Sequence, residues 1–339
     1  MTAAPLRTVV VGLGKIGLGY ADDPVMARHY PFATHAQVLA RHPAFEWGGA
    51  VDLAPEARRA ACERWGVPLV AAEVGEVADA YRPEVVVLAT PPESRLEILE
   101  QLPDVRAVLV EKPLGRTLEE GESFLAWCRA RGIPVQVALW RRADAAFREL
   151  ALTLGERIGA VQAAFALYGN GLLNNGTHVV DFVRMLLGEV TEVQAAAGVA
   201  PYREGPIRDD VNLPFHLALA SGAGVSVQPL RFAHFRENGV DIWGESGRLS
   251  VLQEGLKIRW YPRRENRGMQ GEREVDSDCP VEVPSTVGHA FYALYDDLAE
   301  ALRRGTPLCS PGESALRTAR VVQAVLDSSA RGGAPVRIG

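Results

Sequence analysis

The sequence has few cysteines and no long hydrophobic run. Only four of its 339 residues are cysteine, and none of the four forms a C-x-x-C pair. This spacing argues against a disulfide framework or a zinc site, so we expect reduced thiols, a cytoplasmic protein and no bound metal. No stretch reaches the roughly 18 consecutive apolar residues of a membrane-spanning helix. The N-terminal residues also lack the basic and apolar pattern of a signal peptide.

The chain has no excess of positive charge either. Its 36 lysines and arginines are outnumbered by 42 aspartates and glutamates, which gives a net charge of −6 and an isoelectric point of about 5.7. We therefore expect neither a nucleic acid nor a membrane as a partner. A chain of 339 residues, 47% of them hydrophobic, is long enough for two globular domains of roughly 150 residues each.

The first half opens with a β-branched strand that runs directly into a glycine-rich turn. The pattern G-x-G-x-x-G between a strand and a helix is typical of dinucleotide binding. Its glycines permit a tight turn and a close approach of the main chain to a pyrophosphate, which rests on amide groups at the helix N-terminus. The predicted turn consists of Gly12, Gly14, Lys15, Ile16 and Gly17.

The acidic residue that completes this fingerprint is Asp52, at the end of the next predicted strand. Asp52 lies 35 positions after Gly17, more than the usual spacing of about 20. Residues 19–31 look like an insertion that interrupts the first helix, which we expect to resume around residues 34–41. Asp52 can bind a ribose 2′-hydroxyl and would repel a 2′-phosphate, and Leu53 adds no cation, so NAD is favoured over NADP. The insertion makes Tyr20 a candidate substrate contact, although long loops are more often plain surface loops.

Strands and helices alternate as far as residue 139. Predicted strands at 68–70, 84–89, 107–110 and 133–139 are separated by predicted helices at 55–65, 74–81, 93–102 and 118–131. Such alternation predicts a doubly wound parallel sheet, that is, a Rossmann domain over residues 1–139. Thr117 and Glu120 form a T-x-x-E capping box at the start of the last of these helices.

Two of the predicted strands end in residues that suit a binding site. Ligands bind outside the carboxyl ends of the strands in such sheets. Thr90 and Pro91 follow one strand, and Glu111 and Lys112 follow the next. Lys112 can reach a cofactor and its substrate together, although a solvated lysine in a turn is the simpler interpretation of that residue alone.

The second half, residues 140–339, has a different texture. A helix at 144–154 is followed by β-like runs without intervening helices, which predicts an α+β domain with an antiparallel or mixed sheet. We expect residues 265–279 to form a loop. Helices are predicted at 289–304 and 312–331, and the last helix is a candidate to pack back on the first domain.

One glycine- and asparagine-rich segment stands out in this half. Asn174 and His178 are four residues apart, so they share a face on a helical turn, and Asn175 lies between them. A histidine at the start of a buried helix is more often structural than catalytic. Beside a lysine at the end of a strand, however, His178 is a candidate acid–base residue.

Taken together, these motifs resemble the Gfo/Idh/MocA oxidoreductase family over essentially the whole chain. The resemblance rests on Gly12, Gly14, Gly17, Asp52, Ala89-Thr90-Pro91, Glu111-Lys112-Pro113, Arg142, the segment from Gly176 through His178 to Asp181, and Gly305-Thr306-Pro307 with Ser310. It implies an N-terminal Rossmann domain and a C-terminal domain with an open, mostly antiparallel sheet. It also implies a homodimer or homotetramer.

The resemblance further implies hydride transfer between NAD and a secondary alcohol or ketone of a sugar, sugar nucleotide or polyol. Lys112 would polarise the reacting oxygen, His178 would exchange the proton, and Asn174 would orient His178 or the substrate. Arg142, Asn175 and Tyr20 are the remaining candidate substrate contacts.

Two residues depart from the family pattern. Asn174 stands where aspartate is common, and Arg95 stands where histidine is frequent. Asparagine cannot act as a base, which keeps open a non-catalytic nucleotide-binding sensor or scaffold on the same fold. A reductase of a non-sugar ketone or imine also remains open, because the fold does not decide the substrate.

Overall fold

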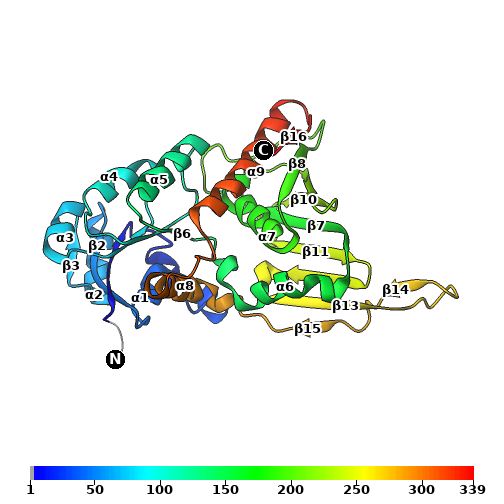
Figure 1. Ribbon diagram of the computed structural model, residues 1–339, viewed down its shortest axis with the longest axis horizontal. Helices are drawn as coiled ribbons and strands as arrows, with labels where there is room; N and C mark the ends of the chain where they lie inside the picture. The colour runs from blue at the N-terminus through cyan, green and yellow to red at the C-terminus, as the bar shows by residue number, and fades with distance from the viewer. Residues whose placement is uncertain (1–3) are drawn as a thin grey trace. The chain divides into compact units, whose positions relative to one another are not determined.

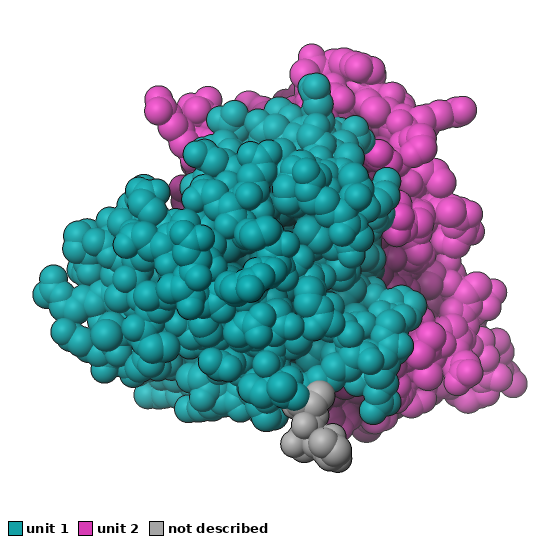
Figure 2. Space-filling model, turned by 60° about the vertical axis from the view of Figure 1, so that its left-hand side comes forward, with its two compact units in different colours: residues 1–144, 288–316 teal, residues 145–287, 317–339 magenta. Residues whose placement is uncertain are grey.

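The protein divides into two compact units. The structure is a computed structural model that describes residues 4–339. The first unit comprises Met1–Asp144 and Gly288–Leu316, and the second comprises Ala145–Val287 and Arg317–Gly339 (Figure 2). Residues 1–3, the start of the segment expected to lack a signal peptide, lie outside the described residues. The domain boundary predicted at residues 139 and 140 stays a prediction.

The first unit contains a six-stranded sheet in the order β3-β2-β1-β4-β5-β6, and neighbouring strands pair in parallel throughout. This is the predicted Rossmann sheet. Its strands are β1 (Leu6–Val11), β2 (Phe45–Val51), β3 (Leu69–Ala71), β4 (Val85–Leu88), β5 (Ala107–Val110) and β6 (Val135–Val137) (Figure 1). Its helices are α1 (His35–Leu39), α2 (Pro55–Trp65), α3 (Val74–Tyr81), α4 (Arg95–Glu100), α5 (Leu118–Ala130) and α8 (Ala290–Arg304).

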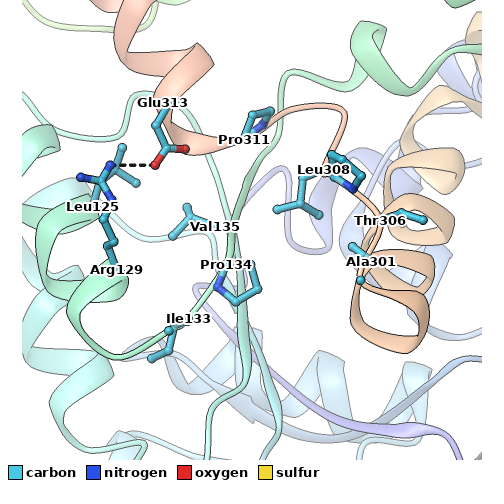
Figure 3. Close-up of a pocket in the computed structure, with 13 residues that line it drawn as sticks. Leu125, Arg129, Ile133, Pro134, Val135, Ala301, Thr306, Leu308, Pro311 and Glu313 are labelled. Atoms are coloured by element: carbon cyan, nitrogen blue, oxygen red, sulfur yellow. Dashed lines mark hydrogen bonds and ion pairs between the residues drawn. The ribbon is translucent and has the colours of Figure 1, made fainter.

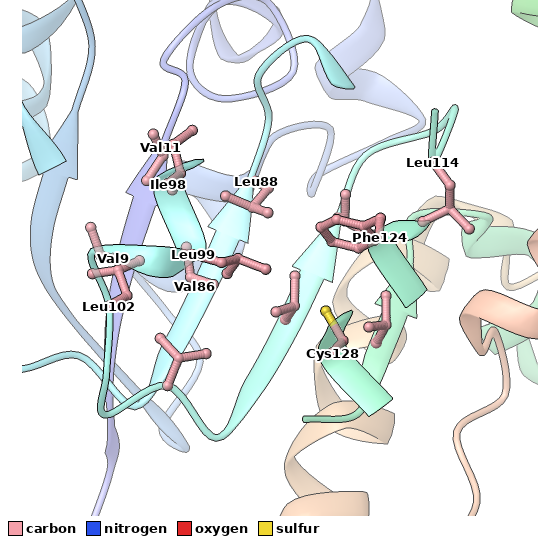
Figure 4. Close-up of a cluster of buried hydrophobic side chains, with 14 of the residues drawn as sticks. Val9, Val11, Val86, Leu88, Ile98, Leu99, Leu102, Leu114, Phe124 and Cys128 are labelled. Atoms are coloured by element: carbon pink, nitrogen blue, oxygen red, sulfur yellow. The ribbon is translucent and has the colours of Figure 1, made fainter. Parts of the chain in front are cut away.

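Both faces of this sheet are buried, which explains why its strands are continuously apolar in sequence. Successive side chains point to opposite faces. Val9 and Val86 therefore lie in a cluster with apolar residues of α3, α4 and α5 (Figure 4). Val10 and Val87 lie in a second cluster with residues of α1, α2 and α8.

The second unit contains a ten-stranded sheet in the order β14-β13-β12-β11-β7-β10-β9-β8-β16, with β15 paired to β13. Strand β10 pairs with β7 in parallel, and the other pairs are antiparallel. The predicted open, mostly antiparallel α+β domain is therefore confirmed. Its strands are β7 (Val161–Gly169), β8 (Val190–Ala195), β9 (Phe215–Leu219), β10 (Gly224–Leu230), β11 (Gly239–Gly244), β12 (Gly247–Leu252), β13 (Lys257–Glu265), β14 (Arg273–Val275), β15 (Val281–Val283) and β16 (Val336–Arg337), and its helices are α6 (Ala145–Ile158), α7 (Thr177–Leu187) and most of α9 (Gly312–Ala330).

The first helix is interrupted and resumes, as predicted. Residues 19–31 hold two short 3₁₀ turns, and α1 spans His35–Leu39, where the amides of His35 and Ala36 donate to the carbonyls of Ile16 and Gly17 before the insertion, both at 3.1 Å. One local expectation is wrong. The expected loop at 265–279 contains β14, which pairs with β13. There Arg264 lies between the carboxylates of Glu274, Asp276 and Asp278, so ion pairing stabilises a hairpin in a segment that looks merely polar in sequence.

Two further results concern the helices. The segment that returns to the first unit is α8 together with the start of α9, whose Ala315 and Leu316 join the cluster around Val9. Thr117 caps α5 as predicted, and its side chain accepts a hydrogen bond from the amide of Glu120. Glu120 itself accepts from the amide of Arg116 at 2.8 Å, one residue before the expected partner. Among residues 4–339, no helix is long and apolar enough to cross a membrane.

Candidate active site

The glycine-rich turn lies at the carboxyl end of β1. Gly12 has φ +96°, and a Cβ atom there would lie 2.6 Å from the carbonyl oxygen of Ala89. Any other residue would therefore be strained and would push β1 and β4 apart. A Cβ atom on Gly14 would meet nothing within 4 Å. The main chain at Gly14 is thus open to close approach by a ligand.

The turn continues as a single helical turn rather than as a long helix. The amide of Leu18 donates to Gly14 at 2.9 Å, and the amide of Tyr20 donates to Lys15 at 2.8 Å. The helix N-terminus expected for the pyrophosphate is this turn, and residues 19–31 then leave the helical path, as predicted.

Asp52 follows β2 and holds the same turn from the side. One carboxylate oxygen accepts from the amide of Leu13 at 2.6 Å, and the other accepts from the amide of Ala54 at 2.8 Å. The guanidinium of Arg58 donates to the carbonyl oxygens of Asp52 and Leu53. The carboxylate is thereby fixed beside the glycine-rich turn, where a ribose hydroxyl would meet it.

Thr90, at the end of β4, carries a polar group without a protein partner. Its hydroxyl oxygen is shielded from solvent and makes no hydrogen bond to any residue that the structure describes. Buried hydroxyls normally have a partner. The open main chain at Gly14, the fixed carboxylate of Asp52 and this hydroxyl together fit a bound dinucleotide.

The loop after β5 carries Glu111 and Lys112, both half-buried. Behind this loop, Glu111 Oε1 lies 3.3 Å from Nε2 of His35, and Nδ1 of His35 lies 2.6 Å from the hydroxyl of Tyr295 on α8. Burial raises the pKa of Tyr295 well above its ordinary value, and the charge of Glu111 adds to this. Tyr295 therefore stays neutral, and its hydroxyl can donate to the ring.

Arg95 connects the loops after β4 and β5. It is 1% exposed, and its guanidinium donates to the carbonyl oxygens of Thr90, Pro113 and Leu114. The sequence marks Arg95 only as a departure from the family pattern. Its contacts depend on two loops that are distant in the sequence, so sequence patterns do not reveal them.

Arg142 and Tyr20, two of the predicted substrate contacts, belong to the first unit. Arg142 lies half-buried in a 3₁₀ turn, Trp140–Ala143, that follows β6, so it occupies the same edge of the sheet as Lys112. Tyr20 lies in the turn Gly19–Asp22 with 38% of its surface exposed.

The second unit carries the remaining candidates on one short segment. Leu172–Gly176 is a π-helical turn that leads directly into α7. The side-chain amide of Asn174 donates to the carbonyl oxygen of Asn170 at 3.1 Å. Asn175 is buried, and its side-chain nitrogen makes no hydrogen bond within residues 4–339. His178 is half-buried in the first turn of α7.

Asp210 fixes this π-helical turn, and the sequence motifs do not indicate it. Its carboxylate accepts from the amides of Leu173 at 2.9 Å and Asn174 at 3.0 Å, and from the amide of Val211 at 2.9 Å. Burial raises the pKa of Asp210 above its ordinary value, although these hydrogen bonds favour the charged form. A Cβ atom on Gly171 would collide with this carboxylate, so the glycine before the turn makes room for the anchor.

Helix α7 is held by polar contacts along its length. Asp181 accepts from the hydroxyl of Thr318 on α9 at 2.9 Å, and Arg184 donates to the same hydroxyl oxygen at 2.6 Å. Arg184 also binds both carboxylate oxygens of Glu189. The helix that begins with His178 is therefore anchored on the side of α9.

A pocket of about 580 Å³ lies elsewhere in the first unit. Its walls include Ile133, Pro134 and Val135, and an ion pair between Arg129 and Glu313 borders it (Figure 3). This is where β6 begins, whereas the predicted cofactor residues lie where the strands end. The pocket is therefore separate from the candidate site.

The family models settle the class of the protein. Residues 6–139 match the NAD-binding Rossmann fold of the Gfo/Idh/MocA oxidoreductase family, and residues 168–338 match the C-terminal α/β domain of the same family. The chain belongs to the Gfo/Idh/MocA oxidoreductase family. The resemblance seen in the motifs, and the expectation of an NAD(P)-binding oxidoreductase, are thereby confirmed.

Named relatives within this family are distant. The scyllo-inositol 2-dehydrogenase (NADP(+)) IolW of Bacillus subtilis is 25% identical over 296 residues, which are 76% of this chain and 80% of that protein. Levoglucosan dehydrogenase in complex with NADH and levoglucosan is 21% identical, with a TM-score of 0.77 over 98% of this chain and 99% of that one. The WlbA dehydrogenase from Bordetella pertussis, in complex with NADH and UDP-GlcNAcA, is 19% identical, with a TM-score of 0.75 over 100% of this chain and 99% of that one.

Proposed function

We propose that this Gfo/Idh/MocA protein transfers hydride reversibly between NAD and a secondary alcohol or ketone of a sugar, sugar nucleotide or polyol. The observation that carries the proposal is Lys112, at the end of a Rossmann strand, next to a loop whose Thr90 hydroxyl has no hydrogen-bond partner among residues 4–339. The relatives support the substrate class, because their names specify an inositol, an anhydrosugar and a nucleotide sugar.

The roles of the residues follow from the charges that develop during oxidation. Bound NAD would accept the hydride that leaves the alcohol carbon. The ammonium group of Lys112 stabilises the negative charge on the reacting oxygen, and an imidazole nitrogen of His178 takes the hydroxyl proton. Asn174 orients His178 or the substrate, while Arg142, Asn175 and Tyr20 bind other substrate groups.

NAD remains the proposed cofactor rather than NADP. Both carboxylate oxygens of Asp52 are fixed by main-chain amides, so the carboxylate cannot easily turn away from a 2′-phosphate. Leu53, which is 80% exposed, brings no positive charge to that position. One relative is NADP-dependent and one similar structure contains NADH, so the two cofactors must be compared directly.

The test is the absorbance of the reduced nicotinamide with NAD and, separately, NADP, across sugars, polyols and sugar nucleotides. We expect turnover with NAD that falls roughly 10²- to 10⁴-fold in Lys112→Ala. Lys257→Ala, which removes an exposed lysine on β13, is the matched control and should keep wild-type rates. Near-wild-type turnover of Lys112→Ala would refute the assigned role.

The same assay separates the proposal from its alternatives. Tight NADH binding without turnover on a broad panel of substrates would favour the sensor or scaffold. The loss of activity would then be explained by Asn174, because asparagine cannot act as a base. Turnover of non-carbohydrate ketones or imines alone would favour the other alternative, a reductase of a non-sugar ketone or imine.

We also propose that the protein assembles as a homodimer or homotetramer in the cytoplasm, through the large sheet of the second unit. Phe165 on β7 and Trp243 on β11 are each 41% exposed. Phe165 pairs with Asp241, two residues from Trp243 along β11, so both rings lie on one face of the sheet. Two neighbouring exposed rings on an open sheet form an apolar surface, and the same surface of a second copy can pack against it.

A further inference from the structure

We propose that Arg95 is a positioning residue that ties the loop after β4 to the loop after β5, and so sets the position of Lys112 relative to the cofactor-binding turn at Thr90. The inference rests on the proposed function for the role of Lys112. It goes further because it assigns the geometry of that site to a buried residue that acts through main-chain carbonyls.

The hydrogen bonds of Arg95 all end on main-chain oxygens of these two loops. Its Nε and Nη2 atoms donate to the carbonyl of Thr90 at 3.2 and 2.9 Å. Its Nη1 atom donates to the carbonyls of Pro113 and Leu114 at 2.6 and 3.3 Å. One planar group thus spans both loops, and its geometry fixes the separation between them.

Packing alone does not explain this residue. Arg95 is the first residue of α4 and is 1% exposed. Leu99, one turn later on the same helix, is buried to a similar extent, with 2% of its surface exposed. A buried charge is costly unless hydrogen bonds and neighbouring charges compensate it, and an apolar side chain would fill the space without that cost.

The guanidinium also remains charged at neutral pH. Burial lowers the pKa of Arg95 to about 10, while the charges of Glu111 and Glu93 act in the opposite direction. The charge strengthens each hydrogen bond to a carbonyl.

Histidine, which is frequent at this position in the family, cannot make the same connection. An imidazole has two ring nitrogens, whereas the guanidinium reaches three carbonyl oxygens on two loops. The tie therefore depends on arginine at position 95. Since small displacements of a catalytic group carry large costs in rate, Arg95 is expected to affect both cofactor binding and turnover.

The experiment compares Arg95→Met, Arg95→Lys and Leu99→Ala with the wild type. Leu99→Ala, on the same helix, is the control for loss of buried packing. Three readouts are measured on the full chain: NADH affinity by nicotinamide fluorescence, hydrogen–deuterium exchange of peptides that cover residues 88–95 and 112–116, and kcat and KM on a substrate that the wild type turns over.

We expect Arg95→Met to weaken NADH binding by about tenfold, which corresponds to the loss of about 1.4 kcal/mol. Exchange should accelerate in both loops together, and kcat should fall. Arg95→Lys, which keeps the charge but not the fork, should recover part of the NADH affinity. Leu99→Ala should lower the melting temperature and leave NADH affinity unchanged.

Wild-type NADH affinity together with unchanged loop exchange in Arg95→Met would overturn the proposal. The proposal would also be overturned if Arg95→Met changed NADH affinity and loop exchange only as much as Leu99→Ala does. If Arg95→Met does not fold, Arg95→Lys decides by the same two readouts. Neither readout needs a substrate, so a failure of the proposed dehydrogenase activity remains distinguishable from a failure of this inference.

Discussion

Asp52, Arg95 and Asp210 are charged side chains that bind main-chain groups of loops rather than one another. Asp52 and Asp210 accept from amides, and Arg95 donates to carbonyls. Loop main chains carry polar groups that no sheet or helix satisfies. A single charged residue can therefore satisfy several of these groups and fix the loop at the same time.

A different residue, His42, couples the fold of the first unit to pH. The amide of Ala44 donates to Nδ1 of His42 at 3.2 Å, so the ring proton is on Nε2, which lies 3.0 Å from the carboxylate of Asp296 on α8. The ring also stacks on Tyr292, with centroids 4.6 Å apart. The neutral ring is thus satisfied on both nitrogens, and burial lowers the pKa of His42, although Asp296 acts in the opposite direction.

We expect this histidine to reduce stability in acid. The unfolded chain binds a proton at His42 as the pH falls through about 6.5, whereas the folded chain resists it, so the free energy of unfolding decreases below that pH. Urea denaturation of the wild type and His42→Phe between pH 5 and 8 tests this. The free energy of unfolding of the wild type should fall toward acid relative to that of His42→Phe, so the advantage of the wild type at neutral pH should narrow. Replacement of the exposed His234 by glutamine should leave the pH dependence of the wild type unchanged. A constant difference across the range would contradict the prediction.

At the scale of elements, an irregular segment carries or adjoins the candidate residues of the second unit. The π-helical turn Leu172–Gly176 precedes α7, and π-helical turns are frequent at functional sites. Its amides depend on Asp210, since those of Leu173 and Asn174 both donate to that carboxylate. The position of His178, which follows the turn, is therefore set by an acidic residue from the loop before β9.

Asp210→Asn should loosen this turn. The substitution keeps the shape but turns one amide nitrogen toward main-chain N–H groups, which leaves a buried donor unsatisfied at a cost of about 1–3 kcal/mol. We expect a lower denaturation midpoint and a fall in kcat, with NADH affinity retained because the cofactor residues lie in the other unit. Asp209→Asn, at the exposed neighbouring position, is the control for loss of charge. Wild-type kcat in Asp210→Asn would show that the turn does not need its anchor.

At the scale of the whole molecule, the sheets of the two units differ in how many of their faces are buried. Both faces of the Rossmann sheet are covered, and α8 returns from the far end of the chain to complete one of them. The large sheet buries one side, where Ala164, Ala166 and Ile242 are at most 6% exposed. Phe165 and Trp243 alternate with them on the other side, so a partner surface is expected there.

Replacing Trp243 by glutamate should therefore dissociate the assembly. Arg248, which lies over the Trp243 ring, is already paired with Asp241, so the glutamate would bring a second carboxylate into the interface and remove the aromatic contact. The variant is therefore expected to elute with a smaller molar mass in size-exclusion chromatography with light scattering. Leu152→Glu introduces the same charge at an 85% exposed leucine on α6 and should leave the molar mass unchanged. A wild-type molar mass for Trp243→Glu would place the interface elsewhere.

The sequence by itself determined the features that depend on near neighbours. Alternating strands and helices, the glycine-rich turn at Gly12 and the cap at Thr117 are set by local sterics and local hydrogen bonds, so they were correctly predicted. The family followed from the order of these motifs along the chain.

Only the tertiary structure decided the features that join distant segments. The hairpin strand β14, the return of α8 to the first unit, and the anchoring roles of Arg95 and Asp210 all depend on contacts between such segments. Arginine and aspartate usually lie on the surface of folded proteins, so the sequence alone does not mark them as buried. What makes these two different is burial against main-chain groups, and burial is a property of the folded chain.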